Sequence, residues 1–147
     1  MWFQAAHAMP NHWLLKTEPS TYSFDDLLRE RRTTWDGVRN NLALSHLRAM
    51  KPGDRVLIYH TGSEKAVVGL ARIASPPYPD PGHDDPRLVV VDLEPEARLD
   101  KPVPLAAIKA DPAFADFPLV RMGRLSVVPV TPEQWKRILG LAGTRER

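Results

Sequence analysis

Two runs of β-forming residues stand close together in the middle of the chain, RVLIYHT at 55–61 and AVVGLARIA at 66–74. Only the polar residues GSEK separate them, so the second run is expected to fold back on the first as an antiparallel hairpin. Short, hairpin-linked strands predict an α+β fold, in which a curved, mostly antiparallel sheet or small barrel is flanked by short helices. The other expected strands are HWLLKTE at 12–18, RLVVVDLEP at 87–95 and RLSVVPV at 124–130.

Caps and residue spacing predict where the helices lie. Ser23 is the expected N-cap of a helix within STYSFDDLLRER, because Asp25 and Asp26 follow it in the first turn, where carboxylates favour the helix dipole. Leucines at helical spacing predict a second helix in NNLALSHLRAM at 40–50. Shorter helices are expected in PLAAIKAD at 104–111 and in DPAFAD at 111–116.

The last helix has the clearest signals in the chain. Thr131 is its expected N-cap, Pro132 its first residue, and Gln134 the second half of a capping box, while Gly143 is the expected C-cap. Prolines mark the remaining segments. SPPYPDPGHDDP at 75–86 is predicted to be a loop without regular structure, and Pro129 predicts that the final strand lies at an edge of the sheet or contains a bulge.

The length of 147 residues corresponds to one domain, which we expect at 12–143, between a flexible leader at 1–11 and a tail at 144–147. The chain has no cysteine, which excludes disulfides, thiolate zinc sites and cysteine nucleophiles and favours a reducing cytoplasm. No apolar run approaches the ~20 residues that a membrane span requires. We therefore expect no membrane partner.

The net charge is only +2, but the charged residues are unevenly spread. Residues 29–55 carry seven basic and three acidic side chains, net +4, whereas residues 76–118 carry four basic and nine acidic side chains, net −5. Residues 121–137 are basic again. The asymmetry permits a one-sided anion-binding face, although from charge alone an ordinary solvated surface is the simpler explanation.

Common catalytic and cofactor motifs are absent from the sequence. There is no phosphate-binding GxGxxG or Walker loop and no GxSxG elbow, and the histidines do not have the spacing of metal ligands. HDD at 83–85 is interpreted as exposed turn chemistry because it lies in the proline-rich loop. His60, Ser63 and Glu64 lie at a strand end and its turn, and a catalytic triad is not predicted there. No metal and no cofactor are therefore expected.

What remains is a set of aromatic and polar residues at the ends of the expected elements. Such a set suits a planar, uncharged ligand, since an aromatic face stacks on a nucleobase with ~1–3 kcal/mol, polar groups bind its edge, and arginines bind an adjoining phosphate. Ordinary structural roles are the alternative: Trp35 as a core anchor, Tyr59 as an inward-facing strand residue, and Arg39 as a surface charge. The set comprises Lys16, Thr17, Trp35, Asp36, Arg39, Asn40, Tyr59, His60, Thr61, Arg121, Arg124 and Ser126.

Four stretches, in this order, resemble the EVE domain family of the PUA-like superfamily: HWLLKTEPSTYSFDDL, WDGVRNNLALSHLRAMKPGDRVLIYHTG, VGLARIASPPYPDP and LVRMGRLSVVPVTPEQWKRIL. The resemblance runs from about His12 to Gly143. It implies a PUA-like pseudobarrel with a pocket for a modified nucleobase, such as methylated or hydroxymethylated cytosine. The implied pocket residues are Lys16, Thr17, Trp35, Asp36, Gly37, Val38, Arg39, Asn40, Tyr59, His60, Thr61, Leu125 and Ser126, and the implied phosphate-binding residues are Arg39, Arg121 and Arg124.

The chain departs from the family pattern at a few positions. The family often has serine at Thr17 and Thr61, and threonine keeps the hydroxyl but adds a methyl group that narrows a pocket. Gly123 stands where serine is frequent, which removes a hydrogen-bonding group near Arg124, and Val128 stands where a longer side chain is common. These differences affect the choice of base more than the fold.

The predicted function is therefore a non-catalytic reader, cytoplasmic or associated with the nucleoid, that takes a modified base of DNA or RNA into its pocket. An enzyme acting on a modified nucleobase or nucleotide is a second hypothesis, with Asp36 or His60 as general acid or base. A third is a protein-interaction module with a vestigial pocket, which would use the acidic, proline-rich loop from Tyr78 to Asp85.

Overall fold

The computed structural model describes residues 11–144. Apart from Asn11 and Thr144, the predicted leader and tail lie outside the described residues. Within this range, no helix is long and apolar enough to cross a membrane.

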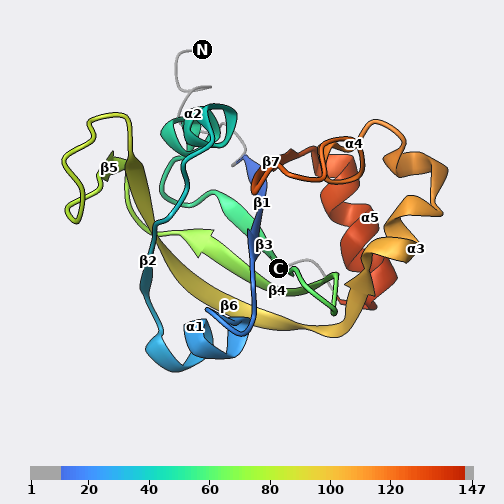
Figure 1. Cartoon of the computed structure of the whole chain (residues 1–147). Helices are drawn as coiled ribbons and strands as arrows, with labels where there is room; N and C mark the ends of the chain where they lie inside the picture. The colour runs from blue at the N-terminus through green and yellow to red at the C-terminus, as the bar shows by residue number, and fades with distance from the viewer. Residues whose placement is uncertain (1–10, 145–147) are drawn as a thin grey trace, which may run out of the picture.

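Seven strands of the described chain make one curled, mixed sheet (Figure 1). Their order is β2-β6-β4-β3-β1-β7, and β5 pairs with β6 beside this path. β1 is parallel to β3, and the other pairs are antiparallel, which confirms the predicted fold class. The strands are β1 (His12–Thr17), β2 (Thr33–Trp35), β3 (Arg55–His60), β4 (Ala66–Ile73), β5 (Tyr78–Pro79), β6 (Val89–Pro104) and β7 (Val127–Val130).

The predicted hairpin is confirmed, because β3 and β4 pair from Arg55 opposite Arg72 to His60 opposite Ala66. The prediction for Pro129 is also confirmed. Its strand, β7, ends the strand order and pairs with β1 on one side, where the missing N–H of a proline is tolerated.

β6 gives the sheet its curl. This strand pairs with β2, β4 and β5 along its length, and its register against β4 shifts twice, between Val67 and Gly69 and between Leu70 and Ala71. Such irregularities bend a strand. Figure 1 shows β6 sweeping beneath β4 toward α3. Sequence patterning predicted only its first half, because the continuation EARLDKPVP is rich in charge and proline and does not alternate.

The helices surround this sheet. Their predicted caps are confirmed: in α1, Asp26 N–H donates to Ser23 Oγ at 3.1 Å, and Ser23 N–H donates to the Asp26 carboxylate at 2.8 Å. Thr131 and Gln134 form the same box at the start of α5. The helices are α1 (Phe24–Glu30), α2 (Asn41–Ala49), α3 (Leu105–Lys109), a 3₁₀ helix (Pro112–Phe114), α4 (Pro118–Arg121) and α5 (Pro132–Ala142).

Three short elements differ from the sequence predictions. No strand was predicted at Thr33–Trp35, which forms β2, and the proline-rich loop contains the two-residue strand β5. Both strands pair with β6. They are therefore defined by long-range hydrogen bonds, and the local residue pattern does not predict them. Pro118–Arg121 forms the single turn of α4, with the proline at the start of the turn.

Phe24 joins α1 to the sheet. A Cβ atom added to Gly69 of β4 would lie 2.5 Å from the Phe24 ring, so only glycine permits this packing. Phe24 is 1% exposed. The contact fixes the segment before α1, which forms part of the site described next.

Candidate functional site

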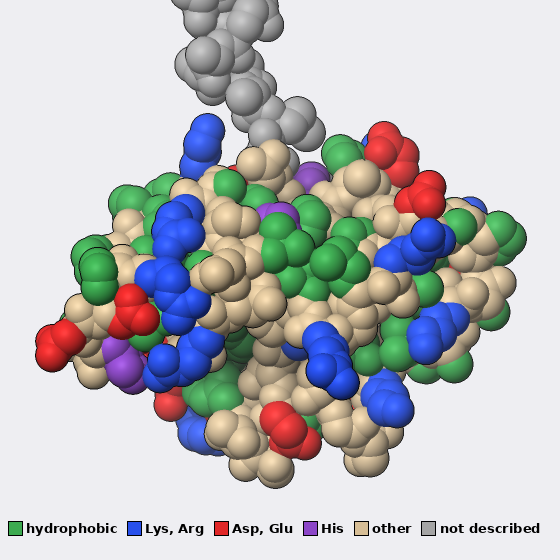
Figure 2. Space-filling model, turned by 45° about the horizontal axis from the view of Figure 1, so that its top comes forward, with side chains coloured by type: hydrophobic (Ala, Val, Ile, Leu, Met, Phe, Trp, Pro, Cys, Tyr) green, Lys and Arg blue, Asp and Glu red, His purple; other side chains and the backbone are tan. Residues whose placement is uncertain are grey.

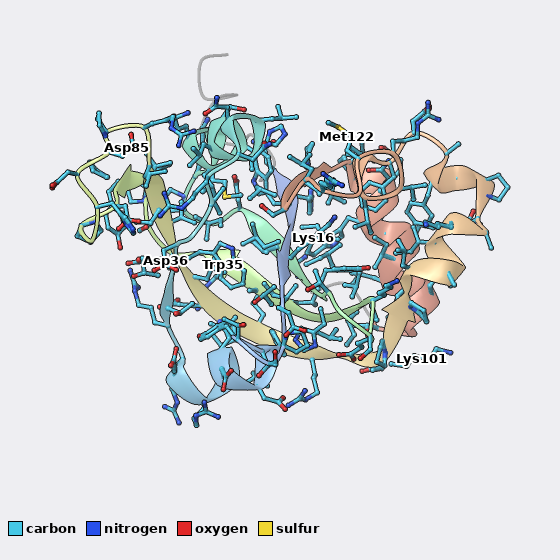
Figure 3. The ribbon with its side chains drawn as sticks, in the orientation of Figure 1. Lys16, Trp35, Asp36, Asp85, Lys101 and Met122 are labelled. Atoms are coloured by element: carbon cyan, nitrogen blue, oxygen red, sulfur yellow. The ribbon has the colours of Figure 1, made fainter. Side chains whose placement is uncertain are left out.

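A cleft of about 540 Å³ opens between the end of β1 and the segment that follows β2. We call it the Trp35 cleft. In Figure 3, Lys16 extends from β1 on one side of this opening, and Trp35 and Asp36 lie on the other. Seven of the predicted pocket residues line the cleft: Lys16, Thr17, Trp35, Asp36, Gly37, Val38 and Ser126.

Trp35 is both a core residue and a wall of the cleft. It lies at the end of β2 opposite Val91 of β6, and only 8% of it is exposed. Gly37, with a φ of 78°, turns the chain directly after Asp36, whose carboxylate is left exposed at the mouth. Trp35 is therefore a core anchor and a lining residue of the cleft at the same time, although these roles were alternatives when predicted from sequence.

The lining of the cleft also includes residues that the sequence patterns did not single out. Thr17 Oγ1 donates to the carbonyl of Tyr22 at 2.7 Å, and the Tyr22 ring lies edge-on to Trp35. The Tyr22 hydroxyl donates to Glu30 at 2.7 Å. Burial, followed by this hydrogen bond to Glu30, raises the pKa of Tyr22 to about 12. The additional lining residues are Thr21, Tyr22, Glu30, Thr33 and Thr34. No periodicity marks them, because they come from a turn, a helix end and the unpredicted strand β2.

Lys16 separates the Trp35 cleft from a second, smaller hollow. Its ammonium donates to the carbonyl of Gly123 at 2.8 Å and lies 5.9 Å from the centre of the Tyr59 ring. Burial lowers the pKa of Lys16. The structure places Tyr59 and Thr61 in the second hollow, away from Trp35.

A third hollow, of about 400 Å³, contains much of the remaining predicted set and is called the arginine hollow. Asn40 also serves as the N-cap of α2, since its Oδ1 accepts from Ala43 N–H at 3.0 Å. The exposed side chains Leu42 and Met122 lie beside the arginines. The lining residues are Asn40, Leu42, Arg121, Met122, Gly123, Arg124 and Leu125.

Arg39 and His60 line none of these three hollows. Arg39 is exposed and contacts His83 Nε2 at 3.2 Å. His60 is buried, its Nε2 accepts from Phe24 N–H at 3.0 Å, and its Nδ1 pairs with Glu64 at 2.7 Å. Both ring nitrogens are thus occupied by structural contacts, and the imidazole does not face the Trp35 cleft.

No group of three or more His, Asp or Glu side chains within residues 11–144 is arranged to hold a metal ion. His83, which the sequence places beside two aspartates, pairs with a different carboxylate. Its Nδ1 lies 3.0 Å from Asp80 Oδ2. This contact closes the proline-rich loop on itself.

Known proteins share this architecture. The sequence model of the family described as the EVE domain matches residues 11–141 of this chain. The chain belongs to the EVE domain family. The resemblance and the PUA-like fold predicted from sequence are therefore confirmed. Among solved structures, Rpa0253 from Rhodopseudomonas palustris is 42% identical, with a TM-score of 0.88 over 93% of this chain and 96% of that one.

Eukaryotic relatives of this EVE domain are also found. Thymocyte nuclear protein 1 of Mus musculus is 31% identical, and the match covers 92% of this chain and 75% of the mouse protein. The human THYN1 protein has been solved in complex with DNA that contains 5-methylcytosine. It is 30% identical to this chain and superposes with a TM-score of 0.79, over 92% of this chain and 99% of the human one.

Proposed function

We propose that this EVE domain is a non-catalytic reader of modified cytosine in DNA, and that the base is bound in the Trp35 cleft. The observation that carries the proposal is the meeting of an aromatic wall, Trp35 with Tyr22, and two charged groups, Asp36 and Lys16, around one cleft of about 540 Å³. The human relative solved with 5-methylcytosine DNA supports the choice of ligand.

The residues around the cleft suit the groups that cytosine presents. Its ring gains ~1–3 kcal/mol from stacking on an aromatic side chain such as Trp35. Its N4 amino group is a donor, and the exposed carboxylate of Asp36 is an acceptor. A methyl group at C5 would fill apolar space beside Val38, and each buried CH₂ contributes ~0.8 kcal/mol.

The same contacts must offset the cost of removing the base from its stack. Flipping a nucleotide out of a duplex costs a few kcal/mol, which is comparable to the stacking gain. Contacts to the phosphates therefore have to supply much of the affinity. Arg121 and Arg124 are exposed in the arginine hollow, which adjoins the cleft through Leu125 and Ser126. Figure 2 shows basic side chains distributed around the hollowed part of this face.

A binding role fits the geometry better than catalysis. Asp36 is exposed at the mouth of the cleft, and Glu30, the other carboxylate in the lining, accepts from the Tyr22 hydroxyl. His60, the other candidate acid or base, holds α1 through Phe24 and pairs with Glu64. The two candidate acid–base residues, Asp36 and His60, therefore do not share the cleft.

The decisive experiment is a binding screen by fluorescence anisotropy at fixed salt. The probes are DNA and RNA oligonucleotides, single- and double-stranded, that carry cytosine, 5-methylcytosine or 5-hydroxymethylcytosine at one position. We expect modified DNA to bind most tightly, with a preference of about fourfold for one buried methyl group. Equal affinity for modified and unmodified cytosine would refute the proposal, a preference for RNA would replace DNA as the partner, and a converted base in the mass spectrum would indicate an enzyme.

Two variants locate the binding site. Trp35→Leu keeps an apolar side chain in the core but removes the stacking ring, so we expect affinity to fall about 5- to 150-fold. Lys136→Gln, on the exposed surface of α5, is the matched control and should bind as the wild type does. Thermal unfolding of both variants establishes that they are folded.

A further inference from the structure

A second hollow adjoins the Trp35 cleft across Lys16, with a volume of about 220 Å³. Its polar lining consists of lysines and hydroxyls, and no aspartate or glutamate of residues 11–144 lines it. We call it the lysine hollow. Its lining residues are Lys16, Tyr59, Thr61, Gly62, Lys65, Leu105, Lys109, Leu119, Val120 and Gly123.

The charges in the lysine hollow are not neutralised from within the protein. Within the described chain, neither Lys65 nor Lys109 forms an ion pair, and the Lys16 ammonium donates only to the carbonyl of Gly123. Glu64, next to Lys65 in the hairpin turn, is paired with His60. Three lysines therefore line a small space in which an anion would supply the missing counter-charge.

Tyr59 points to the same kind of ligand. The residue is 4% exposed, and its hydroxyl has no hydrogen-bond partner among residues 11–144. The hydroxyl nevertheless remains accessible to solvent. Within residues 11–144, the fully buried side-chain atom that lacks a hydrogen-bond partner is Trp135 Nε1 and not the Tyr59 oxygen. Burial raises the pKa of Tyr59, which keeps the phenol protonated and able to donate. A hydroxyl that remains accessible on a buried side chain can donate to a ligand in the hollow.

The backbone at Lys65 adds an independent observation. Its φ is 47°, in the left-handed region that glycine adopts without strain and that a lysine adopts at a steric cost. The carbonyl of Lys65 accepts from Leu105 N–H at 2.8 Å, so the strained turn is fixed against the start of α3. At this position in the lining of the hollow, the chain has a lysine where a glycine would relax the turn.

We propose that the lysine hollow binds a phosphate group, and that this phosphate belongs to the nucleotide next to the base in the Trp35 cleft. The second half of the statement rests on the proposed function. Lys16 lines both spaces, so one side chain bridges the base and the phosphate. Tyr59 and Thr61 would then contact the sugar-phosphate backbone, and Trp35 the base.

Inorganic phosphate tests the site without any assumption about DNA. It is titrated into the ¹⁵N-labelled protein, and the amide signals of residues 59–65 are followed by NMR. We expect saturable shifts in the wild type and in Lys136→Gln, and their loss in the double variant Lys65→Gly/Lys109→Gln. Lys65→Gly is chosen because it removes the ammonium group and relaxes the backbone. Tyr59→Phe should weaken phosphate binding several-fold while the fold is retained.

A second arm asks whether the phosphate comes from DNA. Single-stranded oligonucleotides carry 5-methylcytosine with a neutral methylphosphonate on its 5′ or its 3′ side. One of the two methylphosphonate oligonucleotides should bind the wild type more weakly than the all-phosphate oligonucleotide does. The double variant should bind all three with equal affinity. The slope of log K against log salt should fall by about 0.7 for each lysine that contacts a phosphate.

The outcomes separate the two proposals. Phosphate shifts without any preference for modified cytosine support the site and refute the proposed function. Phosphate shifts together with an unchanged methylphosphonate response support the site but assign it to a small phosphorylated ligand. If inorganic phosphate causes no shifts, and the double variant keeps the wild-type salt slope and methylphosphonate response, the phosphate site is refuted even if modified cytosine is preferred.

Discussion

The ring of Tyr22 meets the ring of Trp35 edge to face, with centroids 6.1 Å apart and planes at 84°. Aromatic pairs in this geometry contribute ~0.5–1.5 kcal/mol beyond the area that they bury. Tyr22 lies before α1 and Trp35 ends β2, so the contact joins two segments that are separate in the chain. The orientation of the stacking wall of the cleft therefore depends on the placement of α1.

Tyr22→Phe should reveal the environment of this phenol through pH. In the folded protein the pKa of Tyr22 is raised to about 12, above its ordinary value of 10. The resulting stabilisation is present below pH 10 and is lost as the pH rises to 12, because only the unfolded chain releases the proton in that window. We expect the stability difference between wild type and Tyr22→Phe to shrink by on the order of 2 kcal/mol from pH 10 to pH 12. Urea unfolding at both pH values measures it, and a constant difference would contradict the prediction.

Asp36→Ala should weaken base recognition without weakening general DNA affinity. The carboxylate is proposed to accept from the N4 amino group of cytosine, and its loss should cost ~1–3 kcal/mol of binding to modified-cytosine DNA. The same carboxylate repels phosphates, so affinity for an oligonucleotide without cytosine should stay the same or rise. Anisotropy titrations with the two oligonucleotides test the change. A parallel loss on both would show that Asp36 does not contact the base.

His60→Ala should affect stability and leave base preference intact. The buried N–H of Phe24 would lose its acceptor, His60 Nε2, which costs ~1–3 kcal/mol. Since the imidazole lies outside the Trp35 cleft, the ratio of affinities for methylated and unmethylated DNA should not change. Urea unfolding and anisotropy together measure both quantities. Full stability with lost discrimination would instead favour a direct role for His60.

Gly69→Ala should destabilise the fold by ~1–3 kcal/mol through overpacking, because the new Cβ would lie 2.5 Å from the ring of Phe24. Phe24→Leu alone should also destabilise, but in the Gly69→Ala background it should recover part of the loss. A double-mutant cycle of unfolding free energies measures this coupling. Additive effects of the two substitutions would show that they do not share one packing site.

Local signals in the sequence were sufficient for the regular elements. The capping boxes at Ser23 and Thr131 depend on residues only a few positions apart, and so does the short GSEK turn. Such local features can be predicted from the sequence without knowledge of the fold. The same reasoning missed β2, which exists only because Thr33–Trp35 pairs with β6 about 60 residues later.

For the site, local pattern identified residues but not their grouping. The polar and aromatic residues at strand ends were predicted as one pocket, yet the structure distributes most of them over three adjoining hollows. Lys16 lies on the wall between two of these hollows because β1 runs beside β3 and carries Lys16 next to Tyr59. Lys65 and Lys109 were not singled out, because an isolated lysine in a turn or at a helix end has no distinguishing sequence signal.

By itself, the sequence determined the family, the α+β class and the caps that begin its helices, since these depend on local spacing and on motifs that occur in a fixed order. Only the tertiary structure decided that Trp35 is at once a core residue and a cleft wall. It also decided that His60 accepts a hydrogen bond from the first backbone N–H of α1, and that three lysines share one hollow with Tyr59. These relationships arise where a curled sheet brings distant strand ends together, and the pairing of distant strands is not encoded in any one stretch of the chain.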